Sequence, residues 1–280
     1  EQVLAQLQYA RANWATVTSD PERQVFVNIP EARVFAIEGE QIVFSMKAIV
    51  GHPSRPTPEL SSAIRSVVVN PSWTVPRSIA VNDILPKQQA DPTYLQRNAI
   101  RVFDARNSAA QEAQYADIVW DDLGENNFPY RLRQDPGPNN ALGRTKFMFP
   151  NSHSVYLHDT PSKSLFERPQ RAFSSGCIRI EDPLTLAELA LDDPEWDRAR
   201  ITRAIDTGRT RILPLTRPLP VLLLYWTAEV GEDGRVYFRE DLYQRDAKLL
   251  QALNESPRVA ETNRMQARAE TRAQRIEFLP

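Results

Sequence analysis

The chain has 280 residues, of which 41% are hydrophobic and 25% charged. These proportions are typical of a globular chain long enough for one large domain or two modest ones. The 34 basic and 36 acidic residues give a formal charge of −2, which argues against a generally basic surface for nucleic acid. No apolar run approaches the roughly 18 to 20 residues of a membrane helix. We therefore expect no nucleic-acid partner and no transmembrane segment in this chain.

The first part of the chain changes from a helical to a strand pattern. Residues 1–14 contain helix-forming side chains without Gly or Pro, and Pro21 follows, so we expect an N-terminal helix within residues 1–20. The first residue is a glutamate without a charged and apolar leader, which we interpret as a processed or trimmed chain. Short β-branched and aromatic runs then predict strands at residues 25–29, 33–37, 41–50 and 66–70.

The pattern becomes more helical after Pro71. Residues 78–89 and 93–98 are helix-like, and residues 100–103 predict a short strand. Because this segment interrupts a series of predicted strands, we expect an inserted, partly helical lid subdomain at about residues 84–128. Its acidic run from Asp117 to Glu125 could pair two carboxylates for glycoside chemistry, but we interpret it as a solvated face.

Strand patterns return at residues 145–149 and 154–158, and residues 183–191 and 194–207 predict helices that each begin near a proline. A hairpin is predicted where residues 219–230 and 235–238 flank a Gly-Glu-Asp-Gly turn. The pattern is helical from residue 241. We therefore expect a mainly β main domain with added α-helices at residues 21–240, and a helical extension at residues 241–280.

Few residues in this chain could bind a soft metal ion. Its single cysteine, Cys177, excludes an internal disulfide. The three histidines, His52, His153 and His158, do not have the spacing of metal ligands. We therefore expect no metal site and no cofactor, and a cysteine that is either packed inertly or chemically reactive.

The segment that contains Cys177 has the features of a thiol-based active site. His158 ends a strand-like run, and Cys177 follows 19 residues later, after the small residues Ser174, Ser175 and Gly176. A thiol becomes nucleophilic when a neighbouring base removes its proton, and histidine is the usual base. The backbone amides of Gly176 and Cys177 could form an oxyanion hole, because small side chains let a substrate carbonyl come close.

These residues also resemble a known family. The His-Asp-Thr-Pro sequence at His158 and the Ser-Ser-Gly-Cys-Ile-Arg sequence ending at Arg179 are similar to the active-site motif of the L,D-transpeptidases, the YkuD-domain enzymes that crosslink bacterial peptidoglycan. The resemblance covers about residues 24–230. Further segments resemble the larger, YcbB-like branch: residues 50–53, 57–58, 69–76, 133–144 and 146–147.

The resemblance implies a role for eight residues. It implies that Cys177 is the nucleophile and His158 the base. Many members of the family have a histidine where this chain has Ser175, so Asp159 or a backbone carbonyl must orient His158 instead. The implied oxyanion and supporting residues are Gly176, Ser175 and Asp159, and the implied substrate-binding residues are Arg179, Tyr156 and Trp73. Arg179 could equally bridge local backbone, and both aromatic residues could equally belong to the core.

The resemblance also implies the fold, the partners and the compartment. The implied fold is a YkuD-type mixed β-sandwich with an inserted lid, and the implied location is the periplasm. The implied reaction is formation of 3-3 crosslinks between peptidoglycan stem peptides through a cysteine thioester, with acylation by carbapenem β-lactams. The alternatives are an L,D-carboxypeptidase or endopeptidase and a non-catalytic peptidoglycan-binding module. Papain-like proteolysis is disfavoured, because in that arrangement the cysteine precedes the histidine in the chain.

Overall fold

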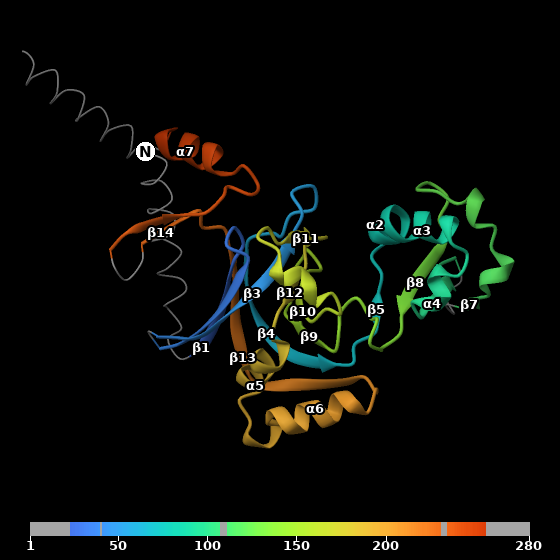
Figure 1. The fold of residues 1–280 in the computed structure, drawn as a ribbon, viewed down its shortest axis with the longest axis horizontal. Coiled ribbons are helices and arrows are strands. Elements are labelled where there is room, and N and C mark those ends of the chain that lie inside the picture. Colours follow the sequence, from blue (N-terminus) through green and yellow to red (C-terminus); the bar gives the residue numbers. More distant parts are fainter. Residues whose placement is uncertain (1–22, 40, 107–110, 231–233, 256–280) are drawn as a thin grey trace, which may run out of the picture. The chain divides into compact units, whose positions relative to one another are not determined.

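The computed structural model describes residues 23–39, 41–106, 111–230 and 234–255. The helix expected within residues 1–20 and the end of the expected C-terminal extension lie outside this range. The described residues up to Leu224 form one compact unit, and the described residues from Tyr225 onward belong to a second unit (Figure 1). No helix in the described ranges is both long and apolar enough to cross a membrane.

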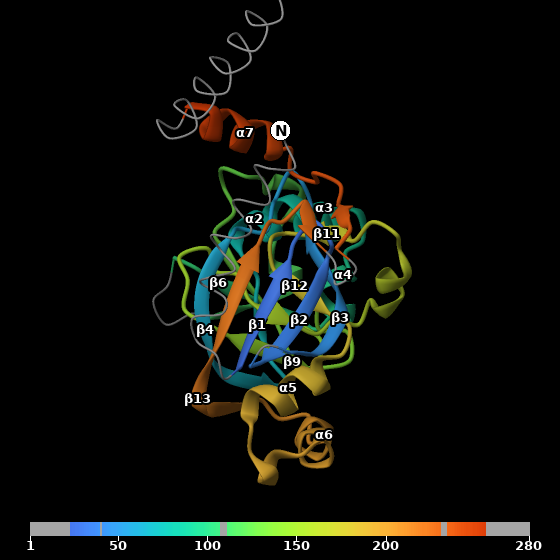
Figure 2. The same ribbon diagram turned by 90° about the vertical axis from the view of Figure 1, so that its left-hand side faces the viewer.

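The first unit is built on a mixed sheet that closes on itself. Its nine strands are β1 (Arg23–Asn28), β2 (Arg33–Glu38), β3 (Gln41–Gly51), β4 (Leu60–Val69), β9 (Thr145–Met148), β10 (Leu157–His158), β11 (Ala172–Ser174), β12 (Ile178–Ile180) and β13 (Arg211–Leu224). Their order is β11-β3-β12-β10-β9-β4-β13-β1-β2, and a further pairing of β2 with β3 completes the ring. Strands β4, β13, β1, β2 and β3 lie side by side in Figure 2. The mainly β fold with a helical insert is therefore confirmed.

The core of this unit lies inside the closed sheet. Alternate β-branched and aromatic residues of the strands point into this interior. Val25, Val67, Phe147 and Val221 are completely buried. Helix α5 (Pro183–Leu191) begins at Asp182, whose side chain accepts hydrogen bonds from the first free amides, and packs against β4 and β13.

The single helix expected at residues 194–207 is interrupted. Pro194–Trp196 forms a short 3-10 turn, and α6 (Arg198–Asp206) starts separately. Asp197 has an extended backbone between them, because its carboxylate accepts a hydrogen bond from the Arg200 amide and caps α6. A further 3-10 turn, Lys163–Glu167, lies in the loop between His158 and Cys177.

The insertion has a sheet and a core of its own. Its strands are β5 (Trp73–Thr74), β6 (Ile100–Asp104), β7 (Glu112–Ala113) and β8 (Tyr130–Gln134), in the order β5-β8-β6-β7. Leu95, Ile100, Val102 and Leu132 are buried among its other apolar side chains. Because β5 and β8 pair with each other, the insertion extends beyond the expected limits of 84 and 128. We call residues 73–134 the inserted subdomain.

The helices of the inserted subdomain match the expected segments, with one irregularity. Helix α2 (Arg77–Ile79), a π-helical turn (Ala80–Ile84) and α3 (Leu85–Ala90) form one continuous helical stretch, and α4 (Tyr94–Arg97) follows. The π-helical turn ends two residues before Pro86, which has no amide hydrogen to donate. The acidic run contains the 3-10 turns Tyr115–Asp117 and Trp120–Asp122, and its carboxylates are exposed, as expected of a solvated face.

The second unit begins where the long apolar run of the sequence leaves the closed sheet. It contains the hairpin β14 (Ala228–Val230) and β15 (Val236–Phe238), and helix α7 (Asp246–Glu255). The Tyr225 hydroxyl donates to Asp241 at 2.6 Å, and Thr227 donates to Asp246 at 2.8 Å. The expected strand at 219–230 is therefore two strands, β13 and β14, because the chain turns at Tyr225–Thr227 to form these contacts.

Candidate active site

The register of three neighbouring strands places three basic side chains in one row. In β10, His158 is directly opposite Lys146 of β9 and directly opposite Arg179 of β12. Side chains of directly opposed residues point to the same face of a sheet. Tyr156 precedes His158 by two residues, and Cys177 precedes Arg179 by two. Because side chains alternate between the two faces of a strand, Tyr156 and Cys177 lie on the same face as this row. Three short strands separated by loops thus create a site rich in titratable groups.

This face borders a cavity of about 750 Å³. Cys177, His158, Arg179 and Tyr156 line it from the closed sheet, and Trp73 lines it from the inserted subdomain. The structure therefore brings together the residues that the sequence predicts for nucleophile, base and substrate binding. Tyr156 and Trp73 both border the cavity, and Trp73 also packs against the core of the inserted subdomain.

His158 is buried and held by its own neighbour in the chain. Its Nδ1 lies 2.5 Å from the backbone carbonyl oxygen of Asp159, and its ring meets that of Tyr156 edge-on at 5.7 Å. Burial, with the positive charges of Arg179 and Lys146, lowers the pKa of His158 from 6.5 to about 3. The imidazole is therefore neutral at physiological pH and has the protonation state of a general base.

The carboxylate of Asp159 points away from His158. Its Oδ2 accepts a hydrogen bond from the Arg144 amide at 2.7 Å, and its Oδ1 lies 2.7 Å from Nζ of Lys163. Of the two orienting groups expected from the sequence, the backbone carbonyl contacts the imidazole, and the carboxylate braces the loop.

Cys177 is a half-buried thiol in a positive environment. Burial raises its pKa, while hydrogen bonds from Tyr156 and the charges of Lys146 and Arg179 lower it. The balance raises the pKa, so the thiol is protonated at neutral pH. No hydrogen bond joins Cys177 to His158 within the described part of the chain. Direct proton transfer between them therefore requires a hydrogen bond that this structure does not have.

The loop before Cys177 is fixed by hydrogen bonds from hydroxyl groups. Ser174 Oγ donates to the Cys177 carbonyl at 2.5 Å and accepts from the Gly176 amide at 3.1 Å. Thr57 Oγ1 donates to the Gly176 carbonyl at 2.9 Å and accepts from the Gly51 amide at 2.8 Å. Gly176 has a φ of +107°, which other residues rarely adopt.

This network changes the expected oxyanion hole. The Gly176 amide is already bonded to Ser174, so it is not available to a substrate in this structure. The amides of Ser175 and Cys177 form no hydrogen bond among the described residues, and both residues border the cavity. We therefore assign Gly176 to the turn, and the free amides of Ser175 and Cys177 remain as candidate oxyanion donors.

Arg179 is a half-buried guanidinium on the cavity wall. No carboxylate of the described ranges pairs with it, and its partial burial lowers its pKa. A partly buried charge without a partner favours binding of an anion. The substrate-binding role expected of Arg179 stays a prediction.

Sequence reasoning missed three residues that shape the site. Ser174 and Thr57 fix the loop through their hydroxyl groups, and Lys146 completes the row on the sheet. Lys146 and Thr57 were part of the family resemblance, but no local pattern assigns them a contact, because their partners lie on distant strands.

His153 borders the cavity and is exposed, whereas His52 contacts Ser54. The described residues contain no group of three or more potential metal ligands.

Comparison with known proteins identifies the class. The family model for the L,D-transpeptidase catalytic domain, YkuD, matches residues 22–212. A Haemophilus influenzae protein named "Putative L,D-transpeptidase" is 36% identical over 233 residues, which are 83% of this chain and 46% of that protein. The chain therefore belongs to the YkuD family of L,D-transpeptidase catalytic domains. It spans about half the length of this relative.

Two solved structures of L,D-transpeptidases are similar at a lower level. The Mycobacterium tuberculosis L,D-transpeptidase 3 is 15% identical with a TM-score of 0.34, over 73% of this chain and 61% of that one. The ertapenem-acylated catalytic domain from E. faecium is 9% identical with a TM-score of 0.32, over 73% of this chain and 98% of that one. Both scores are below 0.5, so the family membership rests on the sequence matches.

Proposed function

We propose that this protein is a peptidoglycan L,D-transpeptidase of the YcbB-like branch, which forms 3-3 crosslinks through a thioester on Cys177. The observation that carries the proposal is one cavity bordered by Cys177, a neutral His158 and the guanidinium of Arg179, which pairs with no carboxylate among the described residues. These groups supply a nucleophile, a base and an anion-binding site for an acidic peptide.

In the proposed first half-reaction, Cys177 attacks the carbonyl carbon of the third residue in a donor tetrapeptide stem. His158 accepts the thiol proton as the S–C bond forms, and the amides of Ser175 and Cys177 stabilise the oxyanion. The peptide C–N bond then breaks, and His158 returns the proton to the departing D-alanine amine. A thioester between Cys177 and the shortened stem remains.

In the second half-reaction, the side-chain amine of a neighbouring stem attacks the thioester carbonyl. The C–N bond of the 3-3 crosslink forms, the S–C bond breaks, and the thiolate takes up a proton. Water in place of the amine would make the protein an L,D-carboxypeptidase, since the steps up to the thioester are the same.

Arg179 is suited to bind a carboxylate of the stem. Its planar guanidinium can form two parallel hydrogen bonds with a carboxylate. Because Cys177 and Arg179 share one face of the sheet, two residues apart, a carboxylate bound here would lie beside the scissile carbonyl. Stems built on meso-diaminopimelate carry such carboxylates.

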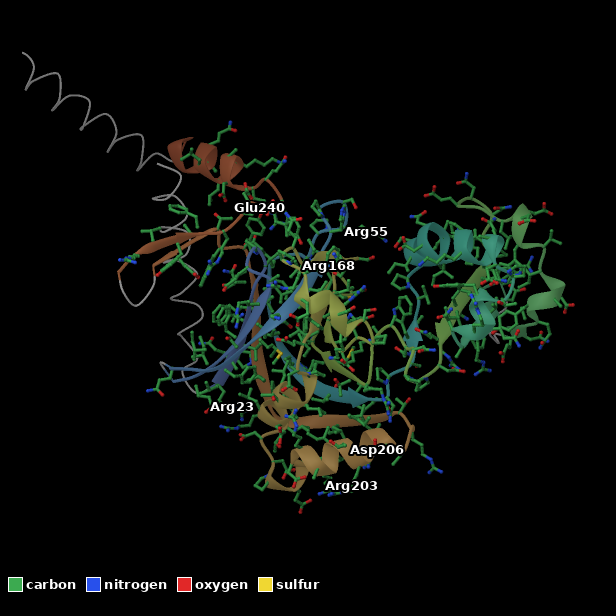
Figure 3. The ribbon with its side chains drawn as sticks, viewed as in Figure 1. Arg23, Arg55, Arg168, Arg203, Asp206 and Glu240 are labelled. Carbon is green, nitrogen blue, oxygen red and sulfur yellow. The ribbon has the colours of Figure 1, made fainter. Side chains whose placement is uncertain are left out.

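The inserted subdomain is proposed to act as a lid that organises the acceptor stem. Arg55, on the loop between β3 and β4, forms hydrogen bonds of 2.5 and 3.2 Å with Asp83 in the π-helical turn. Both residues border the cavity, and Figure 3 labels Arg55. Such an exposed pair is worth at most about 1 kcal/mol, so it can form and break during turnover.

The proposed substrate also implies the compartment. Peptidoglycan stems are crosslinked outside the inner membrane, so we propose a periplasmic location. The stem peptides, and carbapenems as their β-lactam mimics, are the proposed partners.

The test is acylation followed by turnover. Purified protein is incubated with a carbapenem and analysed by intact-mass spectrometry, with Cys177→Ala as the control. We expect the mass of one drug molecule on the parent and none on the variant. Disaccharide tetrapeptides then distinguish the reactions: crosslinked dimers support the transpeptidase, and tripeptides alone indicate the carboxypeptidase. Cleavage of existing crosslinks would indicate an endopeptidase, and absence of acylation and turnover would indicate a binding module.

A further inference from the structure

Lys146 lies in the same row as His158 and Arg179 but does not border the cavity. Its ammonium nitrogen is 3.7 Å from the centre of the Tyr156 ring. This is well within the distance of about 6 Å at which a cation is attracted to an aromatic face. The contact places a positive charge directly behind one wall of the cavity.

Tyr156 connects this charge to the nucleophile. A hydrogen bond from the Tyr156 side chain to Cys177 lowers the pKa of the thiol, and the Trp73 side chain forms a hydrogen bond with Tyr156. Tyr156 therefore contacts the lysine through its ring face and the cysteine through its polar end. A displaced ring would lose the second contact.

Lys146 is half-buried, and among the described residues no carboxylate forms an ion pair with it. Its partial burial lowers its pKa. Removing part of an unpaired ammonium from water costs free energy. A methionine of similar length would avoid this cost, so packing alone gives no reason for a lysine here.

We propose that Lys146 is a positioning residue that holds Tyr156 against Cys177 and thereby favours the thiolate of the nucleophile. The cation fixes the ring, the hydroxyl supports the sulfur, and the positive charge opposes the effect of burial on the thiol. The importance of this arrangement for turnover rests on the proposed function. Its effect on the ionisation of Cys177 does not.

Several other charged groups face the thiol or border its cavity. Arg179 comes from β12 and His158 from β10, and both share the face that carries Cys177. Arg55, Asp83, Lys87 and His153 border the cavity from its loops and from the inserted subdomain. These groups also affect the ionisation of the thiol. A change can therefore be assigned to Lys146 only when the compared variants keep all of them.

The single cysteine makes the test direct. The rate of alkylation by iodoacetamide, in which the thiolate sulfur displaces iodide, is measured from pH 6 to pH 11 for the parent, Lys146→Met and Lys146→Arg. Lys47→Met is the matched control, because Lys47 pairs with Glu167 at the surface and does not border the cavity. Circular dichroism and thermal unfolding check that each variant is folded.

We expect Lys146→Met to raise the midpoint of the rate profile by roughly one pH unit, which is about a tenfold slower reaction at neutral pH. Lys146→Arg should stay close to the parent because it keeps the charge, and Lys47→Met should be unchanged. The melting temperature of Lys146→Met should be equal or higher, since a half-buried charge that forms no ion pair among the described residues is removed. If the methionine variant does not fold, Lys146→Gln replaces it, and the same shift in the midpoint of the rate profile is expected.

A double-mutant cycle with Tyr156→Phe tests the route of the effect. If Lys146 acts by holding Tyr156, the midpoint shift of the double variant should be smaller than the sum of the two single-variant shifts, because either change breaks the same arrangement. Additive shifts would overturn the positioning role. A midpoint in Lys146→Met equal to that of the parent would overturn the proposal as a whole. Carbapenem acylation of the parent, measured alongside, separates either failure from a failure of the proposed function.

Discussion

The imidazole of His158 is oriented by the backbone of the next residue, Asp159, whose carbonyl oxygen lies 2.5 Å from Nδ1. A backbone carbonyl cannot be removed by substituting a side chain. The orientation of the proposed base therefore depends on the path of the chain after β10, which the Asp159 carboxylate stabilises through the Arg144 amide and Lys163.

Asp159→Asn should consequently affect stability more than chemistry. The amide would keep an acceptor for Arg144 but lose the charge facing Lys163, at an expected cost of about 1–2 kcal/mol in the free energy of unfolding. The rate of carbapenem acylation should fall by less than about tenfold, since the carbonyl remains. Urea unfolding and stopped-flow acylation measure the two quantities. A loss of acylation as large as that of His158→Gln would assign a direct role to the carboxylate.

His158→Gln should slow acylation by roughly 10² to 10⁴-fold, the range typical of a positioned acid or base. Glutamine fills a similar volume and can still hydrogen bond, so the variant should fold. The measurement is the rate of drug addition by mass spectrometry at pH 7. An unchanged rate would mean that the thiol proton leaves by another route.

The buried neutral His158 also predicts a pH dependence of stability. Its pKa is lowered to about 3 in the folded state, so below pH 6.5 the unfolded state binds a proton that the folded state does not. The free energy of unfolding should therefore fall as the pH falls from 6.5 toward 3. The contribution of one proton approaches about 1.4 kcal/mol per pH unit. The difference in stability between the parent and His158→Gln should be constant above pH 7, and below it only the parent should lose this contribution.

Cys177→Ala should abolish acylation and transfer while leaving the fold intact, because it removes the only sulfur nucleophile and little volume. The thiol is also uncharged at neutral pH, so the substitution breaks no ion pair that stabilises the fold. Intact mass after drug exposure and circular dichroism are the two measurements. Residual turnover in the variant beyond contamination would disprove the thioester mechanism.

Gly176→Ala should slow acylation and reduce stability. A φ of +107° is costly for alanine, although a Cβ here would meet only ordinary contacts, the nearest at 3.5 Å from the Pro56 carbonyl. The penalty of about 1–3 kcal/mol therefore comes from the backbone rather than from a clash. Relaxation of the turn should displace the Ser175 and Cys177 amides, which acylation rates would report. Gly137→Ala is a useful control, since nothing lies within 4 Å of its Cβ position.

Removing most of the inserted subdomain should impair crosslinking more than acylation. A small β-lactam needs only the thiol, the base and the oxyanion amides, whereas a crosslink also needs an acceptor amine held close to the thioester. Residues 75–132 can be replaced by a short linker, because β5 and β8 are neighbours and their ends lie close together. Equal losses in the two reactions, in a variant folded by circular dichroism, would mean that this subdomain supports the catalytic core instead.

Local sequence determined most of the strands, the helix α5 and the candidate pair of Cys177 and His158. The signals were short-range: alternating β-branched residues, proline at helix starts and a motif within 22 residues. Such signals can be recognised without knowing the tertiary structure. The same signals failed at residues 194–207, where a capping aspartate divides the helix, and at the edges of the insertion.

Only the tertiary structure decided how the site is arranged. The pairing of β9, β10 and β12 places Lys146, His158 and Arg179 in one row, and no local pattern contains that register. The Gly176 amide is occupied because Ser174 folds back on it, and the Asp159 carboxylate turns toward Lys163. Such choices depend on which distant groups compete for each hydrogen bond and on how far each charge is removed from water. Sequence supplies the chemical groups, and the packing of distant strands sets their ionisation and their contacts.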